Sequence, residues 1–290
     1  MTWKAGFRGF KGGSSSPRQP VEAPDSLIST EYARIVDWIS EGEIFGLVNG
    51  AQSILLDETP GSAFPSFSWD SRNGTQDQSY LASFPAVESD IGIGVELQAS
   101  TPWVRAFSDL NLSAVRINFA VPRLLQQNAS NGNTTGYTVA FAIDVAEAGG
   151  PFVQVLSSAF SGKTTGGYRR SVRVDLPGSP PGGWQIRVRR LTPNASSGLI
   201  ADVVNIQSIT EIIDAKFRYP NSAIVGMSFD AETFGGQVPR RGYHIRGRLI
   251  RVPSNYDPET RVYLGTWDGT FQIAYSNNPA WVYYDLLLHP

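Results

Sequence analysis

The side chains that most often carry out chemistry in enzymes are scarce in this sequence. It contains two histidines, His244 and His289, and no cysteine. A zinc or iron–sulfur site built on Cys is therefore excluded, and two histidines are too few for a His cluster or a convincing Ser-His-Asp triad. The sequence has no Gly-x-Ser-x-Gly elbow, no phosphate-binding loop and no dinucleotide fingerprint. We expect no enzymatic activity, no cofactor and no bound metal.

Paired carboxylates are the remaining route to catalysis. A glycosidase needs only two of them at a set separation, and the chain has 26 acidic residues, so chance pairs are certain. A glycan hydrolase therefore stays open as an alternative. The acids that could serve are Asp37, Glu41, Glu43, Asp57, Asp214, Asp230, Glu232 and Asp268.

The charge pattern favours protein partners over nucleic acid. The formal net charge is −2, so no global basic field is present, and we expect no sequence-specific nucleic acid binding. Of the 24 basic residues, 20 are Arg and 4 are Lys. Arg is enriched at packed protein interfaces because its planar fork pairs bidentately and stacks on aromatic rings. A GC-rich genome would give the same bias.

Residues 1–26 have the composition of an extended arm. Gly, Ser and Pro dominate it, and such a segment buries too little apolar surface to fold alone. Trp3, Phe7 and Phe10 are unusual there, because a free linker has no use for large aromatics. We predict that these three side chains dock on a partner; a disordered start is the alternative.

Residues 27–85 are expected to form the first segment of one domain. Tyr32, Ile35, Val36 and Ile39 fall at helical spacing, and Gly42 is a suitable stop, which predicts a helix. A short buried strand is predicted at 54–57.

Residues 86–200 are predicted to form a separate antiparallel β-sandwich. Apolar residues alternate with polar ones over 115–121 and 137–145, and turn clusters separate the candidate strands. On two strands the basic residues share a face: Arg173 on one, and Arg187 and Arg189 on the next. If these strands paired as a hairpin, like charges would need a counter-charge. Such a face is either solvated or meets an acidic partner.

Residues 201–290 are expected to complete the domain begun at 27–85. Strands are predicted over 203–216, 223–229 and 243–249. Asn278 and Pro279 begin a last helix that is apolar nearly all round, so we expect the natural polypeptide to continue beyond Pro290. The candidate interface residues of this part are Arg246, Arg248, Tyr256, Trp267, Phe271, Tyr275 and Trp281, each of which could equally be a core residue.

Three groups of residues resemble the lambda-type phage tail tip attachment protein J family, also called host specificity proteins. The first is Ile39-Ser40-Glu41-Gly42, Ile44, Gly46, Val48, Gly50, Ser53-Ile54, Leu56-Asp57 and Thr59-Pro60. The second is Gly162-Lys163-Thr164-Thr165 and Arg189-Arg190-Leu191-Thr192-Pro193. The third and densest is Thr210-Glu211-Ile212-Ile213-Asp214, Tyr219-Pro220-Asn221, Tyr243-His244-Ile245-Arg246-Gly247-Arg248, Val252-Pro253-Ser254-Asn255-Tyr256, Trp267-Asp268-Gly269-Thr270-Phe271 and Ala274-Tyr275-Ser276-Asn277-Asn278.

The resemblance covers residues 25–290, which are similar to the N-terminal part of the family's proteins. It implies a β-rich α+β fold: a tail-hub domain interrupted by an inserted antiparallel β-sandwich. It implies a homotrimer, the central hub of a virion tail tip, assembled in the host cytoplasm. The implied partners are other tail-tip and distal tail proteins, the tape-measure protein and the tail tube. A host outer-membrane receptor would be met only through downstream regions. A β-sandwich carbohydrate-binding module and a tail-associated glycan hydrolase stay open as alternatives.

Overall fold

The computed structural model describes residues 18–288. The chain forms two compact units, each assembled from segments that are distant in sequence. Unit 1 comprises the described part of Met1–Ser29 together with Asp90–Asn111 and Val115–Thr210. Unit 2 comprises Thr30–Ser89, Leu112–Ala114 and the described part of Glu211–Pro290. None of the helices within residues 18–288 is long and apolar enough to cross a membrane.

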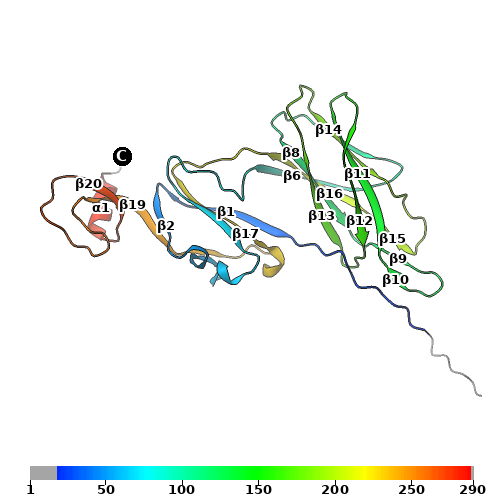
Figure 1. The fold of residues 1–290 in the computed structure, drawn as a ribbon, viewed down its shortest axis with the longest axis horizontal. Coiled ribbons are helices and arrows are strands. Elements are labelled where there is room, and N and C mark those ends of the chain that lie inside the picture. The colour runs from blue at the N-terminus through cyan, green and yellow to red at the C-terminus, as the bar shows by residue number, and fades with distance from the viewer. Residues whose placement is uncertain (1–17, 289–290) are drawn as a thin grey trace, which may run out of the picture. The chain divides into compact units, whose positions relative to one another are not determined.

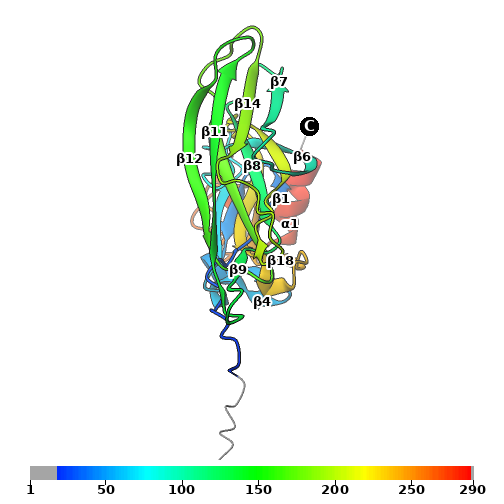
Figure 2. The same cartoon turned by 90° about the vertical axis from the view of Figure 1, so that its right-hand side faces the viewer.

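Two four-stranded sheets make up most of unit 1 (Figures 1 and 2). The first has antiparallel neighbours in the order β12 (Val153–Gly162), β11 (Tyr137–Glu147), β14 (Trp184–Arg190) and β7 (Trp103–Phe107). The second has the order β13 (Tyr168–Asp175), β8 (Ala114–Val121), β16 (Asn205–Ile213) and β6 (Val87–Glu96). A small sheet joins β10 (Thr134–Thr135), β9 (Leu125–Gln127) and β15 (Ile200–Ala201).

Three buried phenylalanines join the two large sheets. Phe119 of β8 lies 4.9 Å from Phe141 of β11 and 5.5 Å from Phe160 of β12, measured between ring centroids. Phe141 and Phe160 stack with 19° between their planes. All three are at most 1% exposed. Burial of the inward-facing residues of two sheets is the defining feature of a β-sandwich, so the predicted sandwich is confirmed. The predicted alternation is confirmed in β8 but is wrong for β11, which is buried on both faces from Phe141 to Ala146.

Unit 2 contains three further sheets, each of three strands (Figure 1). In sheet order they are β1 (Tyr32–Glu41), β17 (Ser222–Asp230) and β5 (Ser68–Asn73); then β18 (Arg241–Tyr243), β3 (Ile54–Leu56) and β4 (Thr59–Pro60); and then β2 (Ile44–Leu47), β19 (Ile245–Pro253) and β20 (Phe271–Tyr275). The 3-10 helices are η1 (Gly50–Ser53), η2 (Gly61–Ala63) and η3 (Ala231–Phe234), and the α-helix is α1 (Pro279–Leu287).

The helix predicted near residues 32–39 is wrong, because these residues form strand β1. Ile35 and Ile39 are four residues apart, which is close to one helical turn but is also two repeats of a strand. The burial alternates with a period of two: Ile35 and Ile39 pack inward against the core, whereas Val36 is exposed. The strand that pairs with β1 is β17, and it lies far along the chain.

The hairpin considered for the arginine-bearing strands does not form either. Strand β13 borders β8, whereas β14 lies between β11 and β7 in the other sheet. The strands predicted at 54–57, 203–216, 223–229 and 243–249 are confirmed in outline as β3, β16, β17 and β18–β19. The last helix is confirmed as α1, with the Asn278 side chain accepting a hydrogen bond from the Ala280 N–H.

Part of the predicted arm lies against unit 1. Backbone hydrogen bonds join the Ala23 N–H to Thr134 O at 2.9 Å, and the N–H groups of Ser26 and Leu27 to Lys163 O at 2.9 and 3.0 Å. The Lys163 ammonium, 3% exposed, lies 2.7 Å from Glu22 and 2.8 Å from Asp25. Trp3, Phe7 and Phe10 lie outside the described residues.

Candidate interaction site

Aromatic side chains hold the C-terminal part of unit 2 together. Tyr256 is 1% exposed, and its ring centroid lies 4.9 Å from that of Tyr263 and 6.1 Å from that of Trp281. The Trp281 indole N–H donates a hydrogen bond to the Tyr263 hydroxyl at 3.1 Å. Trp281 comes from α1, so the contact fixes the helix against the loop after β19.

The aromatic contacts continue outward to the surface. Tyr284 of α1 packs on Trp281 at 5.7 Å and stacks on Phe271 at 5.6 Å, and Phe271 meets Trp267 at 5.2 Å. Trp267 is 43% and Phe271 36% exposed. We call Tyr256, Tyr263, Trp267, Phe271, Trp281 and Tyr284 the aromatic cluster; its inner end is core and its outer end is surface.

A polar contact sets the rotation of α1. The buried Asp285 carboxylate accepts hydrogen bonds from the backbone N–H of Arg251 at 3.1 Å and from its Nε at 3.3 Å. Asp285 therefore faces β19. A buried carboxylate needs such partners, because an unpaired one would lose its hydration without compensation.

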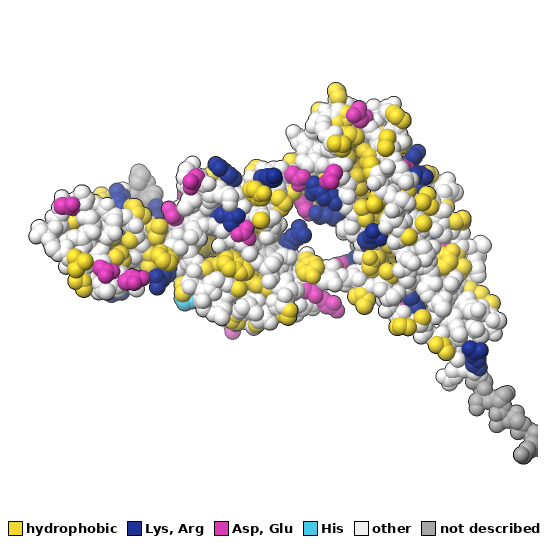
Figure 3. Space-filling model, in the orientation of Figure 1, with side chains coloured by type: hydrophobic (Ala, Val, Ile, Leu, Met, Phe, Trp, Pro, Cys, Tyr) yellow, Lys and Arg dark blue, Asp and Glu magenta, His cyan; other side chains and the backbone are white. Residues whose placement is uncertain are grey.

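The rest of the α1 surface is apolar and exposed. Tyr283 is 62% and Leu287 64% exposed on the side away from Asp285, whereas Leu286, 70% exposed, and Val282, 45% exposed, line a pocket together with Asp285. Figure 3 shows hydrophobic side chains beside basic and acidic ones on the visible face of this C-terminal part. Large apolar residues gathered on one helix face are typical of a contact surface.

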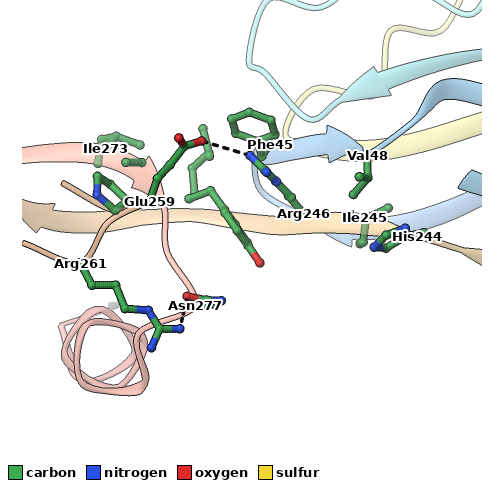
Figure 4. A pocket seen from close by; sticks show the side chains of 13 residues that line it. Phe45, Val48, His244, Ile245, Arg246, Glu259, Arg261, Ile273 and Asn277 are labelled. Carbon is green, nitrogen blue, oxygen red and sulfur yellow. Dashed lines mark hydrogen bonds and ion pairs between the residues drawn. The ribbon is translucent and has the colours of Figure 1, made fainter.

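Elsewhere in unit 2, a groove of about 870 Å³ surrounds Arg246. The guanidinium lies 5.1 Å from the Phe45 ring centroid and 5.9 Å from that of Tyr275, and 3.6 Å from the Glu259 carboxylate (Figure 4). Two rings therefore hold the guanidinium in place, and among the described residues its only ion pair is the one with Glu259.

The structure divides the predicted interface residues among several settings. Tyr256 is core, and Trp281 is half-buried in the aromatic cluster. Arg246 and Tyr275 line the groove together, and the exposed Arg248 approaches Gly42. The remaining arginines, Arg173, Arg187 and Arg189, belong to unit 1 and do not join this site.

The counter-charge for the β14 arginines is Asp144 of the neighbouring strand β11. Its carboxylate is 1% exposed and accepts hydrogen bonds from the Nε of Arg189 at 2.6 Å and from the Nε of Arg187 at 2.7 Å. The hydrogen bond from Arg189, followed by that from Arg187, holds the pKa of Asp144 below its usual value against the opposing effect of burial. The like charges are thus neutralised within the sheet.

The acids considered for catalysis include structural hydrogen-bond acceptors. Burial raises the pKa of Asp37, but hydrogen bonds from Arg241 and Tyr243 outweigh this effect and lower the pKa overall. Asp268 accepts hydrogen bonds from the hydroxyl groups of Thr270, in its own turn, and of Ser254. Within residues 18–288, no group of three or more His, Asp or Glu side chains is placed to hold a metal ion.

Sequence reasoning missed several members of the site. Phe45, Tyr263 and Tyr284 were not singled out, although each contacts a residue that was. The general signal, an excess of aromatic residues near the C-terminus, was available for Tyr263 and Tyr284. No signal was available for Phe45, because only the pairing of β2 with β19 brings it near Arg246.

Comparison with known proteins identifies relatives along the whole chain. Residues 87–215 match the FNIII-A domain of tip attachment protein J. The chain is 39% identical over 288 residues to tip attachment protein J of Escherichia phage SECphi27, covering 96% of this chain and 24% of that protein. It is 38% identical over 297 residues to tip attachment protein J of Escherichia phage SECphi4, covering 99% of this chain and 26% of that protein. The chain therefore spans about a quarter of the length of these relatives.

Among solved structures, a Bacillus endospore appendage protein matches with a TM-score of 0.19 and 8% identity, over 54% of this chain and 93% of the other. A likeness of this size carries no information about fold or function.

Proposed function

Because the chain belongs to the tip attachment protein J family, we propose that it is a structural component of a phage tail tip, located in the virion and not an enzyme. The observation that carries this proposal is the 38–39% identity to two tip attachment proteins along nearly the whole chain. Within the tip, the chain forms a trimeric central hub that closes or continues the tail tube. The hub links the tube to the receptor-binding tip for host attachment and DNA ejection.

In this proposal the two units have different tasks. Residues 86–200 form an inserted β domain, one sheet of which is completed by β16 (Asn205–Ile213), beyond the predicted boundary at residue 200. Residues 27–85 and the rest of 201–290 together form the hub domain that it interrupts. The pairing of β1 with β17 and of β3 with β18 supports the second point, because both pairs join residues before the insert to residues after it. The hub domain contacts sister subunits, the tape-measure protein, the tail tube and other tail-tip proteins.

The exposed face of α1 supports a packing role. Its exposed side chains are apolar, and in the same unit Arg246 lies against the rings of Phe45 and Tyr275. Aromatic and Arg residues are those most enriched at protein interfaces. We infer that Tyr283 and Leu286 are buried when the tip is assembled.

A direct test is the symmetry of the tail tip. Electron cryomicroscopy of the phage that encodes the chain should show three copies around the tail axis. A monomer, or a six-fold ring built from this chain, would contradict the hub. Specific sugar binding by an isolated monomer, or glycan cleavage that is lost when one Asp or Glu is changed, would instead support the binding-module or hydrolase alternative.

A second test concerns the surface of α1. The change Leu286→Ser in the phage should reduce the yield of complete tails counted by negative-stain microscopy while leaving the thermal stability of the purified chain unchanged. The matched control is Val153→Ser, which changes a similarly exposed apolar residue, 63% against 70%, in unit 1. Equal tail yields for the two variants would remove α1 from the interface.

A third test concerns the arm. Deletion of residues 2–20, which include Trp3, Phe7 and Phe10, should lower the yield of complete tails because their docking on a neighbouring tail protein is lost. Normal tail yield would show that the arm does not anchor the subunit.

A further inference from the structure

Strand β1 is a long strand with one unpaired edge. It lies at the end of the sheet order β1-β17-β5, so one side pairs with β17 and no strand within residues 18–288 pairs with the other. It is ten residues long. Proteins usually shorten, twist or cover such an edge, because its free N–H and C=O groups can pair with another chain.

The register identifies the backbone groups that face outward. Ala231 N–H donates to Glu31 O at 2.8 Å, which makes this the first hydrogen-bonded pair of the β1–β17 ladder. Because such pairs alternate in an antiparallel ladder, Tyr32, Arg34 and Val36 direct their N–H and C=O groups away from β17. Trp38, just before the bulge, belongs to the same set.

The same four residues carry exposed side chains. Tyr32 is 57%, Val36 39% and Trp38 67% exposed, and Arg34 is also exposed. An added strand would therefore find hydrogen-bonding groups along the edge and apolar side chains on the adjoining face.

A groove of about 650 Å³ opens where the end of β1 meets β18. Its lining includes Trp38 and Ile39 from β1, and Arg240, Gly242 and Tyr243 from β18 and the residue before it. Strand β18 is itself at the end of its sheet order, β18-β3-β4. A strand lying along β1 would thus reach this open groove.

Charge selects the kind of strand that fits. Within residues 18–288 the side chains of Arg34 and Arg240 have neither an ion pair nor a hydrogen bond. Arg241, in contrast, is matched by Asp37 at 2.6 Å. Two unmatched guanidinium groups favour carboxylates on the incoming strand. The chain's own arm carries Lys4 and Arg8 and has the opposite charge to the one required.

We propose that the free edge of β1 binds an extended segment of a neighbouring protein that carries acidic residues, as an additional β-strand. The segment pairs with the backbone at Tyr32, Arg34, Val36 and Trp38, and its carboxylates meet Arg34 and Arg240. The site follows from the geometry of unit 2 and does not depend on the role proposed for the chain in the tail.

The probe is the peptide Ac-Val-Glu-Val-Glu-Val-Glu-Val-NH2, with peptides of the same length carrying Gln or Lys in place of Glu as controls. NMR titration of the full chain should show saturable binding of the Glu peptide and slower amide exchange at Tyr32, Arg34, Val36 and Trp38. The Gln and Lys peptides should bind at least about tenfold more weakly.

Two sets of variants separate backbone pairing from charge. Val36→Pro removes an outward N–H and should weaken binding at least about tenfold, whereas Ser71→Pro, at an outward-facing position on the opposite edge strand β5, should not. Arg34→Gln with Arg240→Gln should weaken binding of the Glu peptide and leave the Gln peptide unchanged. Circular dichroism establishes that each variant is folded.

Three results would overturn the proposal: no saturable binding up to about 1 mM peptide, equal binding of the Glu and Gln peptides, or a Glu-peptide affinity unchanged by both Val36→Pro and the double Arg variant. Concentration-dependent protection of the β1 amides without peptide would also overturn it, because a second copy of the chain would then be the occupant.

Discussion

The ammonium of Lys163 lies 2.8 Å from the carboxylate of Asp25 and is almost completely shielded from water. The lysine backbone also accepts two N–H groups from the segment that contains Asp25. Lys163 therefore joins an N-terminal segment to the β-sandwich by both its side chain and its main chain.

The first prediction is that acid loosens this segment. Hydrogen bonds from Lys163, followed by those from Thr165, lower the pKa of Asp25 from 3.8 to about 2. Because the pKa is lowered on folding, the contact stabilises the docked segment fully above pH 3.8 and progressively less as the pH falls toward about 2. Amide exchange at Ser26 and Leu27 should accelerate over that range.

The change Asp25→Asn should remove this pH dependence and leave exchange at both amides fast throughout. The control is Asp175→Asn, which removes an exposed ion pair with Arg173 elsewhere in unit 1. If wild type and Asp25→Asn had the same exchange profile, the contact would have no role in docking.

The second prediction concerns Asp144. Replacing it with Ala leaves Arg187 and Arg189 close together without their counter-charge. Both arginines are 31% exposed and can recover some hydration, so we expect a loss of about 2 kcal/mol in the free energy of unfolding, below the usual cost of breaking a fully buried pair. Urea denaturation measures the loss, and a change below about 0.5 kcal/mol would mean that solvent replaces the carboxylate.

The third prediction concerns Gly226 in β17. A Cβ atom there would lie 2.9 Å from the Phe84 ring and 3.1 Å from Leu81, so Gly226→Ala forces both to move. We expect a loss of about 1–3 kcal/mol by thermal or urea denaturation. Gly247→Ala is the control, since nothing lies within 4 Å of its Cβ position, and it should be neutral or slightly stabilising. Equal effects of the two changes would show that the sheet face around Gly226 is loosely packed.

The fourth prediction distinguishes the buried end of the aromatic cluster from the exposed face of α1. Tyr256→Ala removes a buried ring and should cost about 3–5 kcal/mol in the free energy of unfolding. Tyr283→Ala removes a ring that is 62% exposed and should stay within about 0.5 kcal/mol. The reverse order would mean that α1 packs through its outer face.

How far the sequence predicted the structure depended on the range of the interactions involved. The capping by Asn278 and the alternation in β8 are local patterns, and the sequence predicts both correctly. The residues of β11 show the same spacing, but the strand is buried on both faces from Phe141 to Ala146. The spacing in β1 predicts a helix, because spacing alone does not separate one helical turn from two strand repeats when the pairing partner is distant.

The candidate site was predicted less completely for the same reason. Its residue types, Arg and aromatics, were expected, and Arg246, Tyr275 and Trp281 do lie in or beside it. The burial of each ring and the stacking of Phe45 on Arg246 depend on strand pairings between distant parts of the chain. The counter-charge Asp144 was missed because its strand lies between two others in a sheet whose order was not foreseen.

The pairing of Tyr32 with Asp230 has a consequence during translation. The ribosome releases β1 long before it makes β17, which begins at Ser222, and every strand of the β-sandwich is completed in the interval, including β16, which ends at Ile213. Unit 1 can therefore fold while β1 still has both edges open and Trp38 and Val36 unprotected. Pairings between residues so far apart form slowly and leave nascent chains prone to association. During this interval the open edges of β1 could pair with another polypeptide before β17 covers one of them.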